Sequence, residues 1–254
     1  MPSDKARIPP TGERTTYNHH GRRRGRKLRS GRQHLLDTLL PELRVPVTGL
    51  GNAGSTKFSE IRKKFSSLWL EIGFGQGEHI AAQAQGNPDT LLIGCEPYVN
   101  GVSSLLRTID AEAIDNILIH DEDARILLDA LPDASVRRLF LLFPDPWPKS
   151  RHHKRRFIST TNLDRISRVL EDGAEFRFAT DHPGYARWAL WYILNHVEME
   201  WPAERAAEWR VRPLDWPATR YEEKAQADGR ACTYLTFRRR VSARQRAERV
   251  AGLK

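Results

Sequence analysis

Residues 137–156 read RRLFLLFPDPWPKSRHHKRR, and this stretch indicates how the rest of the chain is arranged. Residues 139–143 form an unbroken apolar run of the length typical of a strand buried on both faces of a sheet. The run ends at a segment with three prolines, which cannot continue a sheet because proline has no N–H to donate. We therefore expect a central strand that ends in a rigid turn carrying Asp145 and Trp147. In open α/β sheets ligands bind at the carboxyl ends of the strands, so Asp145 is a candidate site residue.

A dense cluster of cations follows the turn. Its basic residues are Lys149, Arg151, Lys154, Arg155 and Arg156, and two histidines lie among them. Lysine and arginine side chains at this density are typical of surfaces that bind nucleic-acid phosphates. A fixed carboxylate and an indole beside such a cluster indicate chemistry on a nucleic-acid base.

Apolar runs alternate with helical patterns on both sides of the central strand. Such alternation predicts an α/β fold, with a mostly parallel sheet, right-handed crossovers and helices on both faces. The expected strands are 68–72, 90–95, 116–120, 139–143 and 174–179, with 208–212 and 233–239 as a closing pair. The expected helices are 35–40, 77–85, 98–109, 124–131, 161–170 and 183–196.

The positive charge of the chain is concentrated at its N-terminus. The formal net charge is +9, and residues 1–34 contain ten basic and two acidic residues, so the remaining 220 residues carry only +1. This segment lacks apolar periodicity, and we expect a basic, disordered arm at 1–34 followed by one domain at 35–254. The arm indicates contact with nucleic acid, and a solubilising terminus is the alternative.

Composition also argues against several classes of protein. No apolar stretch has the length of a membrane span, and the N-terminus lacks the apolar core of a signal peptide. Cys95 and Cys232 both lie in or beside strand-like runs, for which a reducing compartment is the simplest setting. The adjacent histidine pairs lack metal-ligand spacing, so we expect no metal site. The expectation is a cytoplasmic protein, with a monomer and a homodimer both open.

A glycine motif, LEIGFGQGE, occupies residues 70–78 at the end of the first expected strand. Gly73, Gly75 and Gly77 would let the backbone approach a ligand closely, and the following helix offers free N–H groups. The spacing differs from the dinucleotide fingerprint, and Glu78 would repel a pyrophosphate. The motif therefore favours a neutral or cationic adenosyl ligand over NAD, with a tight turn that binds nothing as the alternative.

Acidic residues follow the next two expected strands. Glu96 lies 19 positions beyond Gly77, where a carboxylate can accept both ribose hydroxyls, although it could be a solvated loop acid. Asp123 could accept from an adenine amino group or cap the helix that follows, and both roles stay open. Asp121 competes with it for the ligand role.

Two later segments also carry candidate side chains. Asp181 follows the strand expected at 174–179 and suits either the site or the N-cap of the next helix. Residues 219–222, Thr219, Arg220, Tyr221 and Glu222, lie in a polar stretch that could fold over the site or form an ordinary loop.

Taken together, these motifs resemble the tRNA (guanine-N7-)-methyltransferase family, whose members modify guanosine 46 in the variable loop of tRNA. The resemblance rests on LEIGFGQG, the acid of GCEP, FPDPWPK followed by RHHKRR, FATD and TRYE, in this order over about residues 68–224. It implies a Rossmann-like class I methyltransferase fold, S-adenosylmethionine as cofactor and tRNA as substrate. The arginine-rich N-terminus lies outside the recognisable pattern.

The resemblance also implies roles for individual residues. Glu71, Glu96, Asp123 and Asp145 match the cofactor-contacting positions of the family, and Asp145 matches its active-site acid. The matches to substrate-binding positions are Lys149, Asp181, Thr219, Arg220, Tyr221 and Glu222, with 151–156 as the RNA-contacting segment.

The chemistry at Asp145 follows from the acceptor atom. Guanine N7 carries a lone pair and no proton, so its methylation needs no strong general base. Asp145 would orient the guanine or balance the positive charge that develops on it, in a direct displacement at the sulfonium methyl. A rigid turn in which Trp147 merely packs is the alternative.

Two other functions compete with this interpretation. A nicotinamide-dependent oxidoreductase is disfavoured by the glycine spacing and by the lack of an evident proton donor. An RNA-binding protein with a non-catalytic methyltransferase fold is the second, and the acids at four strand ends argue against it.

Overall fold

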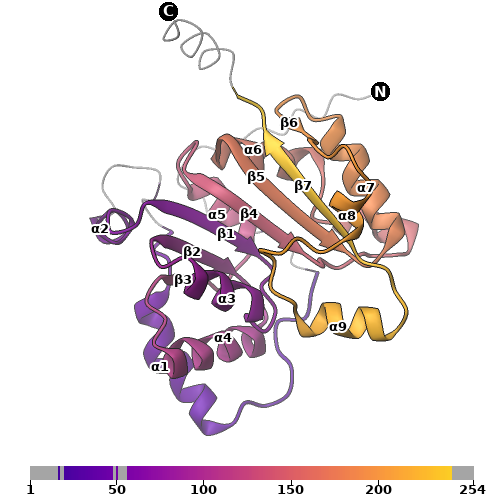
Figure 1. Cartoon of the computed structure of the whole chain (residues 1–254). Helices are drawn as coiled ribbons and strands as arrows, with labels where there is room; N and C mark the ends of the chain where they lie inside the picture. The colour runs from indigo at the N-terminus through magenta and orange to yellow at the C-terminus, as the bar shows by residue number, and fades with distance from the viewer. Residues whose placement is uncertain (1–16, 18–19, 48–49, 51–55, 242–254) are drawn as a thin grey trace, which may run out of the picture.

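A computed structural model describes residues 17, 20–47, 50 and 56–241 of the chain (Figure 1). The described part contains a seven-stranded sheet with the strand order β3-β2-β1-β4-β5-β7-β6. The strands are β1 Ser67–Ile72, β2 Thr90–Cys95, β3 Ile117–His120, β4 Val136–Leu142, β5 Leu170–Thr180, β6 Met199–Glu200 and β7 Thr233–Arg239. Residues 48–49, 51–55 and 242–254 lie outside the described residues.

Helices connect the strands and cover the sheet. Those before β4 are α1 Ser30–Leu43, α2 Thr56–Arg62, α3 Glu78–Gly86, α4 Val99–Glu112 and α5 Ala124–Ala130. Those after β4 are the 3-10 helix η1 Ser150–Arg155, α6 Thr160–Val169, α7 Pro183–Leu194, α8 Ala207–Arg210 and α9 Arg220–Ala227. The strand and helix alternation predicted from the apolar pattern is confirmed up to α7.

The five strands from β3 to β5 in the sheet order are parallel, whereas β7 runs antiparallel to both β5 and β6. Chain order reverses between β1 and β4, which are neighbours in the sheet. Ile72, at the end of β1, is in register with Cys95 of β2 and Leu141 of β4. The loops that leave these three strands therefore meet at one edge, at the switch point where open α/β sheets bind ligands.

Each face of the sheet has its own hydrophobic core. Because side chains alternate along a strand, Leu70 of β1 packs with α5, α6 and α7 on one face, and Trp69 packs with α1, α3 and α4 on the other. Phe140 of β4 shares the second core and is fully buried. Burial on both faces explains why the strands read as continuous apolar runs rather than as alternating ones.

Two expected elements differ from the structure. The strand expected at 208–212 is wrong, because these residues form α8 and an extended segment after it. The Glu208 carboxylate accepts the backbone N–H groups of Glu204 (2.7 Å) and Arg205 (3.0 Å), which stabilises a turn of helix. β7 pairs instead with β6 on one side and β5 on the other. The helix expected at 35–40 begins earlier, at Ser30, so the boundary expected at residue 34 falls inside α1.

The described part of the N-terminal arm lies against α4. Val99 donates its N–H to the carbonyl of Arg23 (3.0 Å), and Asn100 exchanges hydrogen bonds with the backbone of Gly25 (2.8 Å) and Arg26 (2.8 Å). This part of the arm thus differs from the disordered segment that was expected. Residues 1–16 and 18–19 lie outside the described residues.

Candidate active site at the carboxyl edge of the sheet

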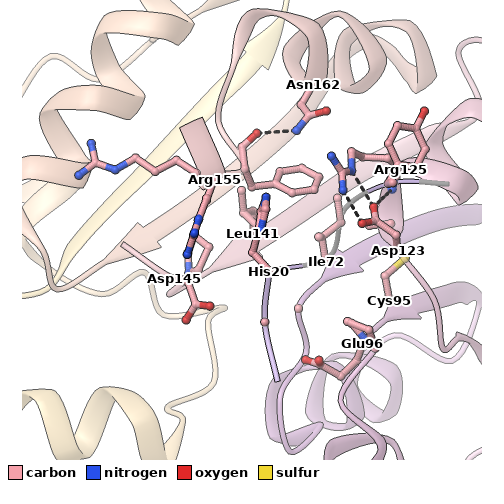
Figure 2. A pocket seen from close by; sticks show the side chains of 18 of the residues that line it. His20, Ile72, Cys95, Glu96, Asp123, Arg125, Leu141, Asp145, Arg155 and Asn162 are labelled. Atoms are coloured by element: carbon pink, nitrogen blue, oxygen red, sulfur yellow. Dashed lines mark hydrogen bonds and ion pairs between the residues drawn. The ribbon is translucent and has the colours of Figure 1, made fainter. Parts of the chain in front are cut away.

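A cavity of about 870 Å³ opens at the carboxyl ends of β1, β2 and β4 (Figure 2). The loops after these strands contribute lining residues to it, and so do η1, α6 and the arm. Eight of the candidate residues named from the sequence are brought together here from the first four loops and η1 with the residue after it: Gly73, Gly75, Glu96, Asp123, Asp145, Lys154, Arg155 and Arg156.

The glycine loop lies at the floor of this cavity. Gly73 has a φ of +77° and Gly75 a φ of +57°, values that side chains disfavour. A Cβ atom at either position would meet no atom within 4 Å, so the loop exposes its backbone to open space. Gly77 does not line the cavity; it is the N-cap of α3 and packs on Leu105 of α4.

Both carboxylate oxygens of Glu96, which follows β2, accept hydrogen bonds from backbone N–H groups. Its Oε2 atom accepts the N–H of Gly75 (2.9 Å), and Oε1 accepts the N–H of Tyr98 (3.0 Å). Burial raises the pKa of the Glu96 carboxyl, the two backbone hydrogen bonds oppose this, and the negative charge of Asp145 adds to the rise. Each carboxylate oxygen keeps a lone pair, and Glu96 lines the cavity, so it can still accept from a ligand (Figure 2).

Asp123 fulfils the capping role that the sequence left open. Its carboxylate accepts the backbone N–H of Arg125 (3.0 Å), at the start of α5, and pairs with the guanidinium of Arg125 (2.6 Å). It also lines the cavity, so a ligand contact is compatible with the cap. Asp121 pairs with Arg44 (2.8 Å) and does not line the cavity, which leaves Asp123 as the acid of this loop that faces it.

Glu71 lies behind the glycine loop, buried and outside the cavity lining. Its Oε2 atom is 2.7 Å from Nδ1 of His79, whose Nε2 atom is 3.3 Å from Nε2 of Gln83. Gln83 in turn donates to the carbonyl of Asp215 (2.7 Å). All these bonds are satisfied together when His79 carries its proton on Nδ1 and Glu71 accepts it. Glu71 therefore supports the glycine loop from beneath.

The turn after β4 holds Asp145 under backbone strain. Phe143 has a φ of +49° and Trp147 a φ of +42°, in the left-handed region that costs an L-residue free energy. Phe143, expected to be the last strand residue, thus lies just beyond β4. Asp145 is exposed and lines the cavity, and its carboxylate accepts no hydrogen bond from any described residue. The turn fixes the backbone of Asp145 and leaves its side chain available.

Arg156 stabilises the turn after β4. Its Nε atom donates to the carbonyl of Pro146 (2.8 Å), and its guanidinium lies over the rings of Tyr185 (5.1 Å) and Trp188 (4.9 Å). Only 5% of Arg156 is exposed, and this burial lowers the pKa of its guanidinium. Arg156 also lines the cavity, and the RNA contact expected for it stays a prediction.

The other cations of the cluster remain accessible. Lys149, Arg151 and Lys154 are exposed, whereas Arg155 is half-buried with its guanidinium 4.9 Å over the ring of Trp147. Lys154 and Arg155 line the cavity, and Lys149 and Arg151 lie outside its lining. Partial desolvation and the charges of these cations, Arg155 first, lower the pKa of His152. The cluster therefore presents positive charge next to Asp145.

The four residues 219–222 start a helix rather than a loop, and none of them lines the cavity. Thr219 is the N-cap of α9, since its Oγ1 atom accepts the N–H of Glu222 (3.2 Å). The buried Glu222 carboxylate accepts from the Tyr234 hydroxyl and pairs with Arg212 (3.1 Å). Arg220 pairs with Glu78, and the ring of Tyr221 packs on that of Phe143 at 5.2 Å.

Asp181 lies at the end of β5 with its carboxylate paired to Arg230. The N-cap of α7 is the neighbouring His182, whose Nδ1 atom accepts the N–H of Tyr185 (3.1 Å), so the capping alternative for Asp181 is wrong. Burial raises the pKa of Tyr221, and the charges of Asp181 and Asp145 raise it further. The charges of Asp181 and Asp145 therefore both act on Tyr221.

Of the four arm residues that line the cavity, Tyr17, His20, Gly21 and Arg22, none was predicted from the sequence, and the side chains of Tyr17 and His20 make specific contacts. The Tyr17 hydroxyl donates to Asp129 and accepts from Arg165 (2.9 Å), and the guanidinium of Arg125 lies 4.3 Å from the centre of its ring. The ring of His20 makes an edge contact with that of Trp147 at 6.4 Å. Both residues stand alone in a basic segment without periodicity, and a pattern of spacing gives no signal for such residues.

Within the described residues, no group of three or more His, Cys, Asp or Glu side chains is arranged to hold a metal ion. The described part of the chain also contains no helix that is both long and apolar enough to cross a bilayer.

The chain is similar to known methyltransferases in sequence. Residues 66–235 match a family model described as "Putative methyltransferase". A relative from Rhodospirillum rubrum, named tRNA (guanine-N(7)-)-methyltransferase, is 48% identical over 225 residues, which are 88% of each chain. One of the same name from Rhizobium meliloti is 46% identical over 228 residues, covering 90% of this chain and 97% of the relative.

Solved structures share the fold at low sequence identity. A 16S rRNA methyltransferase, KamB, superposes with a TM-score of 0.51 at 17% identity and covers 73% of this chain and 94% of its own. The 16S rRNA (adenine(1408)-N(1))-methyltransferase from Catenulisporales acidiphilia gives a TM-score of 0.51 at 12% identity, covering 73% and 93%. These two likenesses show the Rossmann-like class I methyltransferase fold.

Proposed function

The chain belongs to the tRNA (guanine-N7-)-methyltransferase family, and on this premise we propose that it methylates N7 of guanosine 46 in the variable loop of tRNA, with S-adenosylmethionine as methyl donor. One observation of the site carries the proposal. The Asp145 carboxylate, without a hydrogen-bond donor among the described residues, lines the same cavity as the exposed glycine loop and Glu96. A reaction on tRNA also agrees with a cytoplasmic location.

The cavity fits the cofactor on its β1–β3 side. S-adenosylmethionine supplies an electrophilic methyl group on a sulfonium centre. The backbone at Gly73 and Gly75 would lie against it, because no side chain fills the space in front of these residues. Glu96 would accept the ribose hydroxyls with its remaining lone pairs, and Asp123 would face the adenine. Glu71 would act from behind, by holding the loop in place.

The turn after β4 would hold the reacting base. Guanine N7 needs no proton removed, so the work left to the protein is to position the base and to stabilise the charge that develops on it. The strained turn presents Asp145 without an internal partner, and such a carboxylate can accept from the donor groups of guanine. As methyl transfer makes the purine cationic, the negative charge of Asp145 favours the transition state over the ground state.

The accessible cations would hold the tRNA backbone. Lys154 and Arg155 line the cavity, Lys149 and Arg151 are exposed in the same segment, and all four are suited to phosphate oxygens. Their contribution should weaken as salt concentration rises, because binding releases counterions from the RNA. The target guanosine would have to leave its tertiary contacts to reach the cavity.

The test is to map the product. Purified protein is incubated with S-adenosylmethionine and unmodified tRNA, and the RNA is then cleaved chemically at 7-methylguanosine and sequenced. One modified position, guanosine 46, is expected, and a tRNA with adenosine at this position should give no product. If tRNA binds and no methylated nucleotide forms, the non-catalytic RNA-binding alternative is correct. A product at another guanosine would refute the assignment of position 46.

A further inference from the structure

The start of α9 is tied directly to the start of α3. The Oε2 atom of Glu78 accepts the backbone N–H of Arg220 (2.9 Å), and Oε1 is 3.0 Å from Nε of the same arginine. Both oxygens of one carboxylate thus hold one residue, through its backbone and its side chain. Neither Glu78 nor Arg220 lines the cavity.

A second tie lies one turn further along α3. Gln83 donates to the carbonyl of Asp215, in the segment that leads to α9, and Gln83 is linked through His79 to Glu71 behind the glycine loop. The carboxylate of Asp215 is in turn held by Arg177 of β5 (2.7 Å). The segment before α9 is therefore anchored to α3, the helix that follows the glycine loop.

These ties connect two parts of the site that are far apart in the sequence. The glycine loop ends at Gly77, the N-cap of α3, and Glu78 is the next residue. On the other side, Tyr221 follows Arg220 and packs on Phe143, two residues before Asp145. If the glycine loop moved, Glu78 would move with it. The Glu78 carboxylate would then shift Arg220 and Tyr221, and the Tyr221 ring packs on Phe143 near Asp145.

The exposure of the pair argues against a purely structural anchor. The side chain of Arg220 is 85% exposed and that of Glu78 30%, and ion pairs this exposed add little to stability. The anchor of α9 is instead the buried Glu222, bonded to Tyr234 of β7. The Glu78–Arg220 contact adds a second, weaker hold at the first turn of α9.

We propose that Glu78 and Arg220 are positioning residues that couple the cofactor cavity to the tRNA-binding side of the site. This rests on the proposed function for the identity of the two ligands. A cofactor that orders the glycine loop also orders the first turn of α9, so tRNA binds more tightly to the loaded protein. By thermodynamic linkage, tRNA increases the affinity for the cofactor by the same factor.

The coupling factor is measured with S-adenosylhomocysteine, which binds without turnover. The dissociation constant of tRNA is determined with and without S-adenosylhomocysteine, and that of S-adenosylhomocysteine with and without tRNA. Arg220→Ala removes the ion pair alone, and we expect the factor to fall about two- to threefold. Glu78→Ala also removes the charge-assisted bond to the backbone, so a fall of about tenfold is expected. The double variant should match Glu78→Ala.

Glu200→Ala is the matched control. Glu200 also pairs with an arginine, Arg240 (3.6 Å), but at the opposite edge of the sheet, and its loss should leave the factor unchanged. Glu78→Gln provides a second variant should Glu78→Ala unfold.

Three results would overturn the proposal. Glu78→Ala could weaken S-adenosylhomocysteine binding equally with and without tRNA, as a direct cofactor contact would. Arg220→Ala could weaken tRNA binding equally with and without S-adenosylhomocysteine, as a direct RNA contact would. The wild-type protein could show no coupling at all. Turnover of the wild-type protein, measured separately, tests the proposed function whatever these results are.

Discussion

The two halves of the site are built in different ways. The half that we propose for the cofactor, the cofactor half, uses the loops after β1, β2 and β3 and presents mainly backbone and the half-buried acids Glu96 and Asp123. The half that we propose for the substrate uses side chains from the turn after β4, from η1, from the end of β5 and from the start of α9. The first half takes its residues from three strands that are adjacent in the sheet, whereas the second also draws on the end of β5 and the start of α9, which follow much later in the chain.

The acids of the two halves also differ in what they bond. Glu96 accepts from Gly75 and Tyr98, Asp123 accepts from Arg125, and Glu71 is bonded to His79. These carboxylates shape the cavity through bonds within the chain. Asp145 has no hydrogen bond to a described residue and depends on a strained turn for its position. The half with internally bonded acids is therefore suited to holding a cofactor. The half that contains Asp145, whose carboxylate has no hydrogen bond to a described residue, is suited to the reacting base.

The largest expected effect tests the unused carboxylate. Asp145→Ala should lower kcat by roughly 10²–10³-fold, because it removes negative charge where positive charge develops. The affinity for tRNA should change by less than about threefold, since phosphate contacts supply most of it. Asp145→Asn, which keeps the shape, should lose nearly as much turnover. Single-turnover rates and filter binding measure the two quantities, and equal losses in both would contradict the orienting role.

The next effect tests the cofactor half through Glu96. Two hydrogen bonds to an ionised carboxylate should make Glu96→Gln bind S-adenosylhomocysteine about 10- to 100-fold more weakly. In the wild type the affinity should fall as pH is lowered, and the fall should begin above the usual carboxyl range because burial raises the pKa of Glu96. The affinity falls at low pH because the ribose hydroxyls donate to the ionised carboxylate, and protonation of Glu96 removes this acceptor. Calorimetry from pH 7.5 to 5 on both proteins tests this; an equal slope for Glu96→Gln would exclude Glu96 as its source.

A smaller effect distinguishes two parts of the arm. Deleting 1–29 removes nine basic and two acidic residues, whereas deleting 1–16 removes three basic and two acidic ones. The longer deletion should weaken tRNA binding about tenfold and lower the slope of log K against log salt concentration by about three or more. The shorter one should change the slope by about one at most. An unchanged slope after the longer deletion would show that the arm does not contact tRNA.

The smallest effect separates two cations of the cluster. Lys154→Ala should weaken tRNA binding about two- to threefold and lower the salt slope by about 0.7–0.9, as the loss of one phosphate contact does. Arg156→Gln, which removes the charge, should leave the slope unchanged and lower the melting temperature, because Arg156 bonds Pro146 and is buried between aromatic rings. Thermal melts and salt titrations of both variants decide; a lower slope for Arg156→Gln would place Arg156 on the RNA.

Much of the fold and of the cofactor half could be predicted from the sequence. Buried parallel strands must be apolar on both faces, so the runs at β1, β2 and β4 are visible without an alignment. The glycine loop, Glu96 and Asp145 follow directly from strand ends, and the carboxyl ends of parallel strands meet at one edge. Local pattern misled at 208–212, where a carboxylate that bonds two backbone N–H groups favours a turn of helix over a strand.

Amino-acid order by itself determined the α/β class, the place of the site and the residue types available there, because these depend on periodicity and on short-range spacing. Only the tertiary structure decided which of those side chains are free to meet a ligand. Arg156 and Glu222 have the same chemistry as accessible residues of their type, yet folding buries them among partners from distant segments. Partner choice over such separations depends on packing, which no local pattern records.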